Sequence, residues 1–335
     1  MDSLFPQDSS EVPLIGIAKL AAEGEALAEG HKVDYFSIQN RSLLARCNSP
    51  RVPFRWMINP YRGCEFACKY CYARYTHEFM EMRDGLDFER KIYVKQHSAW
   101  LLRQELRQVR PGESIAIGTS TDPYQPAERK FGVTRAIMEE LARHEGLSLG
   151  MVTKSDLVVR DLDLLRAIAA KNRFSIHITV TTTKTDLARI LEPRAPRPDL
   201  RLNAVKKLVE AGIHAGINCA PVLPGITDSP ADLESVVCAA AEAKARSVAA
   251  HPLFLKPCSE KVFMPFLEEH FPHLVQSYKV RYANRAFLPA QYSRRISALV
   301  TKLCQKYRIG ERDERARFAP KSATRLTIQL ALFAG

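Results

Sequence analysis

The chain has 335 residues, of which 46% are hydrophobic and 26% are charged, and its formal net charge at neutral pH is +12. A chain of this length and composition can bury the core of one large α/β domain with additions. No uninterrupted apolar run approaches the roughly 20 residues of a membrane helix, and residues 1–8 carry acidic groups without the apolar core of a secretory signal. We therefore expect a cytoplasmic protein with no membrane partner.

The first 50 residues are expected to form an N-terminal extension. They hold four Lys or Arg against seven Asp or Glu, so this part of a basic chain is acidic. An Ala- and Glu-rich stretch near residues 17–28 predicts a short helix, and a polar segment then runs from Gly30 to Pro50. We expect the chain to continue as a core domain over residues 51–256 and a C-terminal region over residues 257–335.

Within the core, short apolar or β-branched runs alternate with amphipathic stretches. The runs predict six strands, at residues 55–59, 114–118, 147–153, 174–181, 214–220 and 247–255. The stretches predict helices that include 133–144, 162–171, 200–211 and 231–245. Such alternation requires parallel strands joined by crossover helices, so six units fit either an open doubly wound sheet or an incomplete TIM-like barrel. Periodicity alone does not separate the two.

After residue 256 the pattern becomes mostly helical, with breaks expected at Pro257, Pro265 and Pro272. Residues 276–335 hold thirteen Lys or Arg against three Asp or Glu, which makes this the basic part of the chain. A basic helical face predicts either a surface that meets the phosphates of a nucleic acid or a solvated helix that keeps the protein soluble. The basic residues whose spacing aligns several of them on one face are Arg281, Arg285, Arg294, Arg295, Lys302, Lys306 and Arg308.

Three cysteines, Cys64, Cys68 and Cys71, lie within eight residues directly after the first predicted strand of the core, with the spacing C-x3-C-x2-C. Three thiolates can hold three irons of a cubane [4Fe-4S] cluster, for which four protein ligands are usual. The fourth iron is then open to a small molecule, which makes it a reaction site. The other cysteines show no such pairing and are expected to be ordinary thiols: Cys47, Cys219, Cys238, Cys258 and Cys304.

A zinc site is the alternative interpretation of the same cysteines. His77 follows the triplet closely, and three thiolates with one imidazole can form a tetrahedral zinc site. Zinc sites usually pair two-ligand clusters across a longer gap. The spacing therefore favours the iron–sulfur interpretation over zinc.

The cysteine triplet, with Tyr70 directly before its third cysteine, resembles the radical SAM (S-adenosylmethionine) superfamily, and within it the branch of spore photoproduct lyase. The resemblance covers roughly residues 55–256 and implies a partial (β/α)6 TIM-like barrel. It also implies that SAM chelates the open iron. An electron from a donor such as flavodoxin or ferredoxin would then cleave SAM to methionine and a 5'-deoxyadenosyl radical. Because that radical takes a hydrogen atom from the substrate, we expect a radical SAM enzyme of lyase-like type.

In such a barrel the site lies on the loops at the carboxyl ends of the strands. The resemblance places Tyr70 against the adenine of SAM. The polar segment after the second strand contains Thr121 and Asp122, which are candidates to accept from the SAM ammonium, although Asp122 precedes a proline and is also suited to cap the turn. After the third strand, Lys154 is the candidate cation for the SAM carboxylate.

The fourth predicted strand carries three polar residues, His177, Thr179 and Thr181, that alternate with apolar ones and therefore share one face. The resemblance assigns Thr179 or Thr181 to the ribose of SAM. His177 fits either a proton carrier near the substrate or a core histidine.

Two charged residues near later strands have open roles. Glu192 belongs to a pattern that recurs in the lyase-like branch, or it pairs with Arg194 or Arg197. Lys256, at the end of the sixth strand, is placed to reach an anion of the substrate.

Where spore photoproduct lyase has a cysteine that returns a hydrogen atom, this chain has Thr119. An O–H bond is too strong for a hydroxyl to replace a thiol in that step, so we expect a substrate other than spore photoproduct. The basic C-terminal region and the branch favour a nucleic acid. Two further functions stay open: a zinc-stabilised nucleic-acid-binding protein without catalysis, and a radical SAM enzyme that acts on a peptide or small metabolite.

Overall fold

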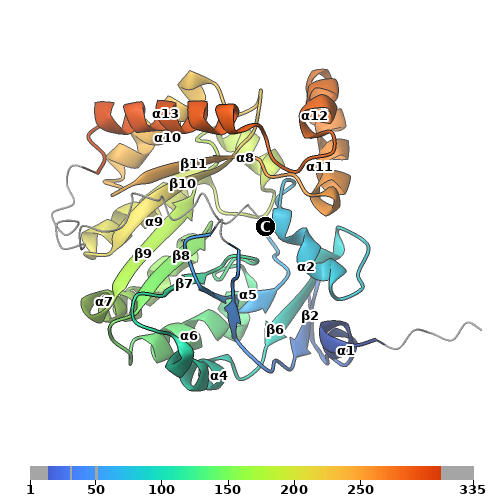
Figure 1. Ribbon diagram of the computed structural model, residues 1–335, viewed down its shortest axis with the longest axis vertical. Coiled ribbons are helices and arrows are strands. Elements are labelled where there is room, and N and C mark those ends of the chain that lie inside the picture. The colour runs from blue at the N-terminus through green and yellow to red at the C-terminus, as the bar shows by residue number, and fades with distance from the viewer. Residues whose placement is uncertain (1–13, 31, 50–51, 311–335) are drawn as a thin grey trace, which may run out of the picture.

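The core of the protein is a seven-stranded sheet in the computed structural model, which describes residues 14–30, 32–49 and 52–310. The strand order is β11-β10-β9-β8-β7-β4-β3 (Figure 1). Six of these strands are parallel and lie side by side in chain order, which is the order of a partial (β/α)6 barrel. They confirm the six predicted strands and are β4 (Trp56–Ile58), β7 (Ser114–Ile117), β8 (Ser148–Thr153), β9 (Arg173–Thr179), β10 (His214–Val222) and β11 (Val248–Pro252).

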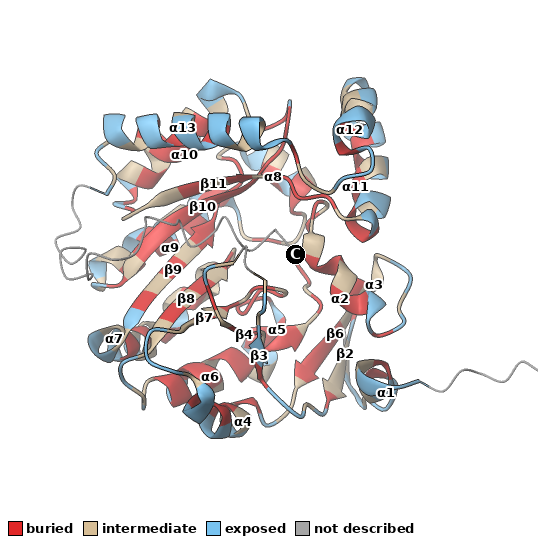
Figure 2. Ribbon diagram, in the orientation of Figure 1, coloured by how far each residue is buried: buried red, intermediate tan, exposed pale blue. Residues whose placement is uncertain are grey.

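Helices cover the outer face of this sheet, because each crossover between consecutive parallel strands carries one. Figure 2 shows the strands as mostly buried between these helices and the barrel interior. The predicted helices are present as α6 (Val133–Leu141), α7 (Leu162–Lys171), α9 (Pro198–Glu210) and α10 (Pro230–Glu242). Five more helices in these connections are α2 (Tyr75–Glu78), α3 (Asp87–Arg90), α4 (Ser98–Glu105), α5 (Ala127–Phe131) and α8 (Thr185–Leu191).

The N-terminal residues contribute strands where the sequence predicted a helix and a polar segment. The predicted helix over residues 17–28 is shorter, α1 (Gly16–Ala22). It ends before Gly24, which lies so close to residues 33–38 that a Cβ would sit 2.5 Å from the carbonyl oxygen of Ser37. A second sheet follows, in the order β1-β2-β6-β5. Its strands are β1 (Ala26–Gly30), β2 (Val33–Ile38), β5 (Tyr61–Arg62) and β6 (Lys91–Lys95).

The strand β3 (Leu44–Arg46) joins the N-terminal residues to the main sheet, where it pairs antiparallel with β4. Glu105 of α4 holds this strand in place. Its carboxylate accepts from the backbone amides of Leu43 at 2.9 Å and Leu44 at 2.7 Å. The N-terminal residues therefore complete the edge of the sheet that carries β4, and the division of the chain at residues 50 and 256 stays a prediction.

The C-terminal region is mostly helical over its described part, as predicted. Its helices are α11 (Pro257–His270), α12 (Val275–Tyr282) and α13 (Ala290–Lys306). Pro257 begins α11, whereas Pro265 lies inside that helix and does not break it. The predictions for residues 1–8 and for the basic residues after 310 lie outside the described residues.

The long helix α13 closes the sheet beside its last parallel strand. It buries Ile296, Val300 and Leu303 and packs against β11 and α10 (Figure 1). Its opposite face is exposed and carries basic residues. Within the part of the chain that is described, no helix combines the length and the apolar character needed to cross a membrane.

Candidate cofactor site

An open cleft lies at the carboxyl ends of the barrel strands, where the sequence predicted the site. Its empty space is about 780 Å³, including the part that is open to solvent. All three cysteines of the triplet line this cleft, together with residues at or after the ends of β7, β8, β9, β10 and β11. The predicted SAM-binding residues that line it are Tyr70, Thr121, Asp122, Lys154 and Thr179.

The cysteine loop follows β5 directly, and Gly63 forms its first turn. Gly63 has a φ of +83°, in the left-handed region that glycine adopts without strain. A Cβ there would sit 2.7 Å from the carbonyl oxygen of Lys91 and 2.8 Å from that of Phe88. The Phe88 carbonyl also accepts from the Cys64 amide at 2.9 Å. The loop backbone is therefore packed against the chain at the end of α3 (Asp87–Arg90).

We expect Gly63→Ala to lower the free energy of unfolding by about 3 kcal/mol, because alanine adds left-handed strain and a clash with two carbonyl groups. Gly146→Ala is the matched control, since Gly146 has a φ of +75° but nothing lies within 4 Å of its Cβ position. The control should cost only about 1 kcal/mol. Urea unfolding measures both values, and equal losses would contradict the close approach at Gly63.

A buried arginine fixes the middle of the cysteine loop. The Arg74 side chain has no exposed surface and pairs with Glu89 at 2.5 Å. Its guanidinium also donates to the carbonyl oxygens of Cys68 at 3.0 Å and Gly85 at 2.5 Å. Because a buried guanidinium needs such acceptors, this ion pair holds the backbone at the second cysteine in one position.

His77 is engaged outside the cleft. It lies in α2 (Tyr75–Glu78), where its Nε2 atom is 3.1 Å from the carbonyl oxygen of Lys91. Burial lowers the pKa of His77 to about 4. Among the described residues, no three His, Cys, Asp or Glu side chains are arranged to hold a single metal ion. A [4Fe-4S] cluster needs no such arrangement, because each thiolate binds its own iron.

Burial determines the protonation of the three thiols. It raises the pKa of Cys64 well above the usual value, that of Cys68 to about 12, and also that of Cys71. The positive charge of Lys154 lowers the pKa of Cys68 and that of Cys71, against the effect of burial. Thiols release their protons when a metal binds, and three sulfur donors that line one cleft suit the irons of an iron–sulfur cluster. The residues present therefore fit the cluster that the spacing predicted.

Asp122 is buried in the loop after β7 and accepts three hydrogen bonds. The donors are the Thr153 hydroxyl at 2.6 Å, the Lys154 amide at 2.7 Å and the Tyr124 amide at 2.9 Å. The hydrogen bond from the Tyr124 amide caps the turn, which is the second role that the sequence suggested for Asp122. Burial raises the pKa of Asp122, although the three hydrogen bonds lower it. Asp122 thus caps the turn and also lines the cleft.

Thr121, the neighbour of Asp122, supports the cysteine loop. Its hydroxyl donates to the Gly63 carbonyl at 2.6 Å, and the Gln125 amide donates to the same hydroxyl at 3.0 Å. Gln125 also accepts from the Glu65 amide at 2.9 Å. The segment after β7 is therefore bonded to the start of the cysteine loop at several points.

Lys154 brings a positive charge to the cleft. Its ammonium lies 5.6 Å from the centroid of the Tyr70 ring, and among the described residues it has no hydrogen-bond or ion-pair acceptor. Burial lowers the pKa of Lys154, but Cys68 and Glu192 together outweigh burial and raise it above the usual value. A half-buried ammonium without an acceptor is a suitable partner for a ligand carboxylate.

Tyr70 and Thr181 meet at Glu192, beside the cleft. The Tyr70 hydroxyl donates to the Glu192 carboxylate, and the Thr181 hydroxyl donates to the same oxygen at 2.8 Å. Thr181 is therefore engaged inside the structure and does not line the cleft, whereas Thr179 does. The ion-pair partner of Glu192 is Arg201, at 2.5 Å, so the pairing with Arg194 or Arg197 considered from the sequence is wrong.

Three other polar residues singled out from the sequence are His177, Thr119 and Lys256. The Nε2 atom of His177 is 3.2 Å from the Ser247 hydroxyl, and burial lowers the pKa of His177 to about 4, as for a core histidine. Thr119 lines the cleft, and its hydroxyl accepts from the Asn59 amide at 3.0 Å. The ammonium of Lys256 lies 3.9 Å from the centroid of the Tyr75 ring.

Sequence reasoning did not single out Arg201, Arg74 or Glu89. Arg201 lies four residues before Val205 and seven before Leu208, which are both buried on the inner face of α9. That spacing was the available signal, because an arginine on an apolar helix face needs a buried partner. Arg74 and Glu89 belong to different short helical segments, and nothing in the sequence pattern joins them.

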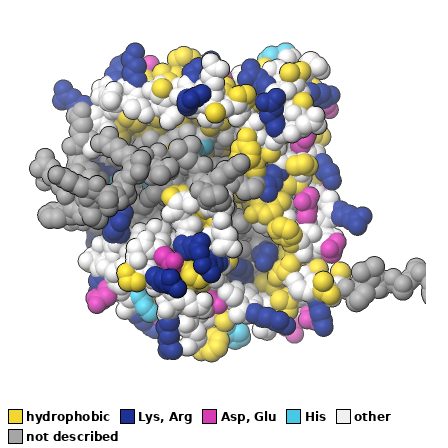
Figure 3. Space-filling model, viewed as in Figure 1, with side chains coloured by type: hydrophobic (Ala, Val, Ile, Leu, Met, Phe, Trp, Pro, Cys, Tyr) yellow, Lys and Arg dark blue, Asp and Glu magenta, His cyan; other side chains and the backbone are white. Residues whose placement is uncertain are grey.

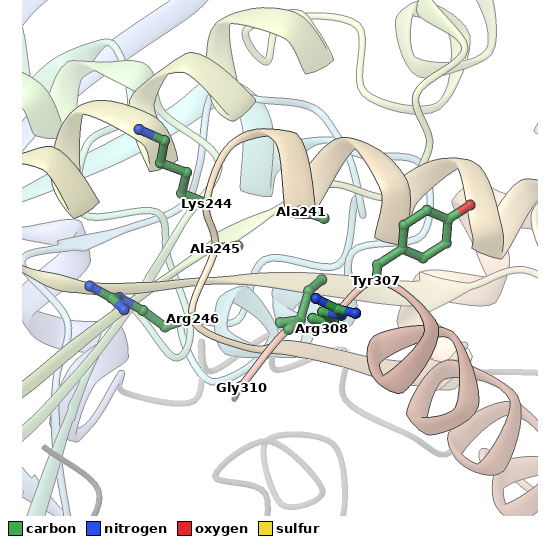
Figure 4. A pocket seen from close by; sticks show the side chains of 8 residues that line it. Ala241, Lys244, Ala245, Arg246, Tyr307, Arg308 and Gly310 are labelled. Atoms are coloured by element: carbon green, nitrogen blue, oxygen red, sulfur yellow. The ribbon is translucent and has the colours of Figure 1, made fainter. Parts of the chain in front are cut away.

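A second, small pocket lies at the opposite edge of the sheet. It is formed where α10 ends and the chain leaves α13 (Figure 4). Lys244 and Arg246 line it and precede β11 at its amino end. No cysteine of the triplet and no predicted SAM-binding residue lines this pocket, so it is separate from the cleft.

Known proteins share this sequence pattern. The family described as the radical SAM superfamily matches residues 58–235. An uncharacterised protein of Mycobacterium tuberculosis is 35% identical over 289 residues, which are 85% of this chain and 84% of that protein. An uncharacterised protein of Methanocaldococcus jannaschii is 28% identical over 241 residues, which are 72% of this chain and 85% of that protein.

Solved structures share the fold. Spore photoproduct lyase complexed with dinucleoside spore photoproduct matches with a TM-score of 0.62 at 16% identity, over 82% of this chain and 80% of that chain. At this identity the likeness concerns the fold alone. The family match, which spans more than half of the chain and contains all three clustered cysteines, decides the assignment. The chain therefore belongs to the radical SAM superfamily, whose members use a [4Fe-4S] cluster and S-adenosylmethionine.

Proposed function

We propose that Cys64, Cys68 and Cys71 hold the [4Fe-4S] cluster of a radical SAM enzyme. The observation that carries the proposal is that the three thiols line one cleft together with Lys154, whose ammonium has no acceptor among the described residues. When bound, the cluster and SAM supply reductive cleavage to methionine and a 5'-deoxyadenosyl radical, which abstracts hydrogen from the substrate. We propose flavodoxin or ferredoxin as the type of electron donor.

In this proposal the chain's own side chains bind and orient SAM. Lys154 donates to the methionine carboxylate, and Asp122 accepts from the methionine ammonium with the Oδ2 lone pair that its three hydrogen bonds leave unused. Thr179 contacts the ribose, since the Thr181 hydroxyl is engaged by Glu192. The Tyr70 ring lies against adenine, and Thr121 acts through the loop that it supports.

Anaerobic reconstitution tests this function. We expect iron and acid-labile sulfide in equal amounts, and release of 5'-deoxyadenosine from SAM when a chemical reductant is added. Stoichiometric zinc without sulfide would overturn the proposal and would favour the non-catalytic nucleic-acid-binding protein instead.

We propose a nucleic acid as the substrate, over a peptide or small metabolite. The loop between α12 and α13 adjoins the cleft wall, because the Leu255 amide donates to the Ala286 carbonyl at 3.0 Å. Arg285, the residue before Ala286, is exposed, and Lys256 is the residue after Leu255 on the other side of the same contact. On the face shown in Figure 3, Lys and Arg side chains lie around a group of hydrophobic ones near α2. Cations beside aromatic rings suit phosphates and stacked bases.

Part of the predicted basic face is neutralised within the protein. Lys306 pairs with Glu234 at 2.6 Å, and Arg295 lies 3.9 Å from Asp228. Among the described residues, no acid pairs with Arg285. Arg285 is therefore a better candidate for a phosphate contact than the helix residues that already have partners.

We expect Arg285→Ala to weaken binding of a single-stranded oligonucleotide about three- to tenfold at roughly 0.1 M salt, and to reduce the salt slope by about 1, since one phosphate contact is lost. Lys171→Ala is the control, because Lys171 is an exposed lysine at the end of α7, before β9 and thus at the far edge of the sheet. Fluorescence anisotropy over a range of salt concentrations measures both. Binding by the unaltered chain that does not change with salt would favour a peptide or small metabolite.

The proposal does not extend to spore photoproduct itself. The Thr119 hydroxyl accepts from the Asn59 amide, and we propose that Thr119 takes the place of the lyase's hydrogen-donating cysteine. Its O–H bond is too strong for that step. We therefore propose a lyase-like reaction on a different nucleic-acid substrate.

A further inference from the structure

Glu192 is a buried carboxylate beside the cleft that the proposed SAM contacts do not use. It lies directly after α8 and is 1% exposed. The hydroxyls of Tyr70 and Thr181 donate to one of its oxygens, and Arg201, also 1% exposed, pairs with the other at 2.5 Å. A buried charge pair of this kind is held strongly, because neither partner can turn to water.

The turn that carries Glu192 is also bonded to the cysteine loop through the backbone. The Lys69 amide donates to the Leu191 carbonyl at 3.0 Å, and the Arg194 amide donates to the Phe66 carbonyl at 3.3 Å. These two bonds lie on either side of Cys68. The loop around the second cysteine is therefore fixed to the turn after α8 at three points, counting the Tyr70 hydroxyl.

Arg201 extends the same connection into the barrel. Its guanidinium donates to the carbonyl of Thr179 at 3.1 Å and to that of Pro196 at 2.6 Å. Thr179 ends β9 and lines the cleft. One buried ion pair thus joins the cysteine loop to the strand end at which SAM is proposed to bind.

The charges of this pair reach the second cysteine. The Tyr70 hydroxyl, two residues after Cys68 in the chain, donates to the Glu192 carboxylate, and Arg201 pairs with the same carboxylate. Lys154 is a third charge there, since its ammonium lies 5.6 Å from the centroid of the Tyr70 ring. The charge around Cys68 is therefore a balance between the buried Glu192 carboxylate and two cations, the buried Arg201 and the half-buried Lys154.

We propose that Glu192 is a positioning residue, which holds the cysteine loop through Tyr70 and, with Arg201, sets the charge beside Cys68 and so the reduction potential of a bound cluster. The inference rests on the proposed cluster site. A negative charge near a cluster disfavours the added electron, and a positive charge favours it. The two partners must therefore act on the potential with opposite signs.

The test uses Glu192→Gln, which keeps the shape and removes the charge, and Arg201→Met, which removes the opposite charge. In Glu192→Gln we expect the reduction equilibrium constant to rise about tenfold, equal to a positive shift of about 59 mV for one electron. In Arg201→Met we expect a shift in the negative direction, since a positive charge beside the cysteine loop is lost. A redox titration followed by the electron paramagnetic resonance signal of the reduced cluster measures both.

Glu128→Gln is the matched control. Glu128 is likewise fully buried, accepts from the Tyr61 hydroxyl at 2.6 Å and pairs with Arg160 at 2.7 Å, but among the described residues its side chain bonds to none of residues 64–71. Its loss should destabilise the fold without moving the potential. Shifts of equal sign in the two test variants, or none in either, would overturn the inference. If only one variant folds, a positive shift in Glu192→Gln or a negative shift in Arg201→Met supports the inference, and the opposite sign or no shift overturns it.

A second measurement does not need the cluster. In the iron-free chain, Glu192→Gln should speed hydrogen exchange at the amides of Lys69 and Arg194, whereas Glu128→Gln should leave it unchanged. Unaltered exchange in Glu192→Gln would overturn the positioning role. Because this readout is independent of iron, a failure of the inference can be told apart from a failure of the proposed cluster site.

Discussion

Cys68→Ala is expected to give a folded chain that assembles no stable [4Fe-4S] cluster and produces no 5'-deoxyadenosine from SAM. Cys68 supplies one of only three thiols at the cleft, and the two that remain cannot hold three irons. We expect both the iron–sulfur absorbance and the cleavage of SAM to fall below detection. Absorbance, iron content and chromatography of the nucleoside product measure the effect on anaerobically reconstituted protein.

The control for this experiment is Cys238→Ala. Cys238 lies on α10 and does not line the cleft, so its loss should change neither the absorbance nor the product. Circular dichroism on both variants checks that they fold. A cluster that survives in Cys68→Ala would show that the ligand set includes another side chain and would refute the assignment.

Lys154→Met is expected to weaken SAM binding by roughly 30-fold, because truncating one partner of a buried charge pair costs about 2 kcal/mol or more. The cluster should still assemble, since Lys154 is not a ligand. Because methionine keeps the apolar part of the lysine side chain, the loss of SAM affinity reports the loss of the positive charge. Equilibrium binding of radiolabelled SAM to the reconstituted protein measures the change in Kd.

Lys206→Ala serves as the comparison for this variant, because Lys206 is an exposed lysine on α9 that does not line the cleft. Lys154→Arg should recover part of the affinity, since it restores the charge with a different shape. An unchanged Kd in Lys154→Met would remove Lys154 from the proposed site, even if the cluster is present.

The six barrel strands were predictable because each is a short run of apolar or β-branched residues bounded by turn signals. The second sheet was not. Residues 26–30 resemble the Ala- and Glu-rich helix that precedes them in composition, and only pairing with β2 makes them a strand. β6 carries a strand signal in Ile92, Tyr93 and Val94, which lies outside the regular alternation of the core. Tertiary pairing, and not local preference, determines these strands.

The site was predictable to the extent that its residues follow strands. Lys154 comes directly after β8 and Asp122 lies in the loop after β7, and parallel strands bring such positions to one edge of the sheet. Thr179 and Thr181 could not be separated from the sequence, because only the structure shows that Glu192 engages Thr181. The anchoring pairs of Arg74 and Arg201 depend on contacts between distant segments, which no local pattern encodes.

The antiparallel strand β3 has a practical consequence for anyone who shortens this chain. A fragment that starts at residue 51 would lack Leu43 and Leu44, would leave the Glu105 carboxylate buried without its two amide donors, and would expose the edge of β4. Bare strand edges promote aggregation. Fragments for crystallisation or labelling should therefore begin upstream of Leu43, so that the strand next to the cysteines keeps its cover.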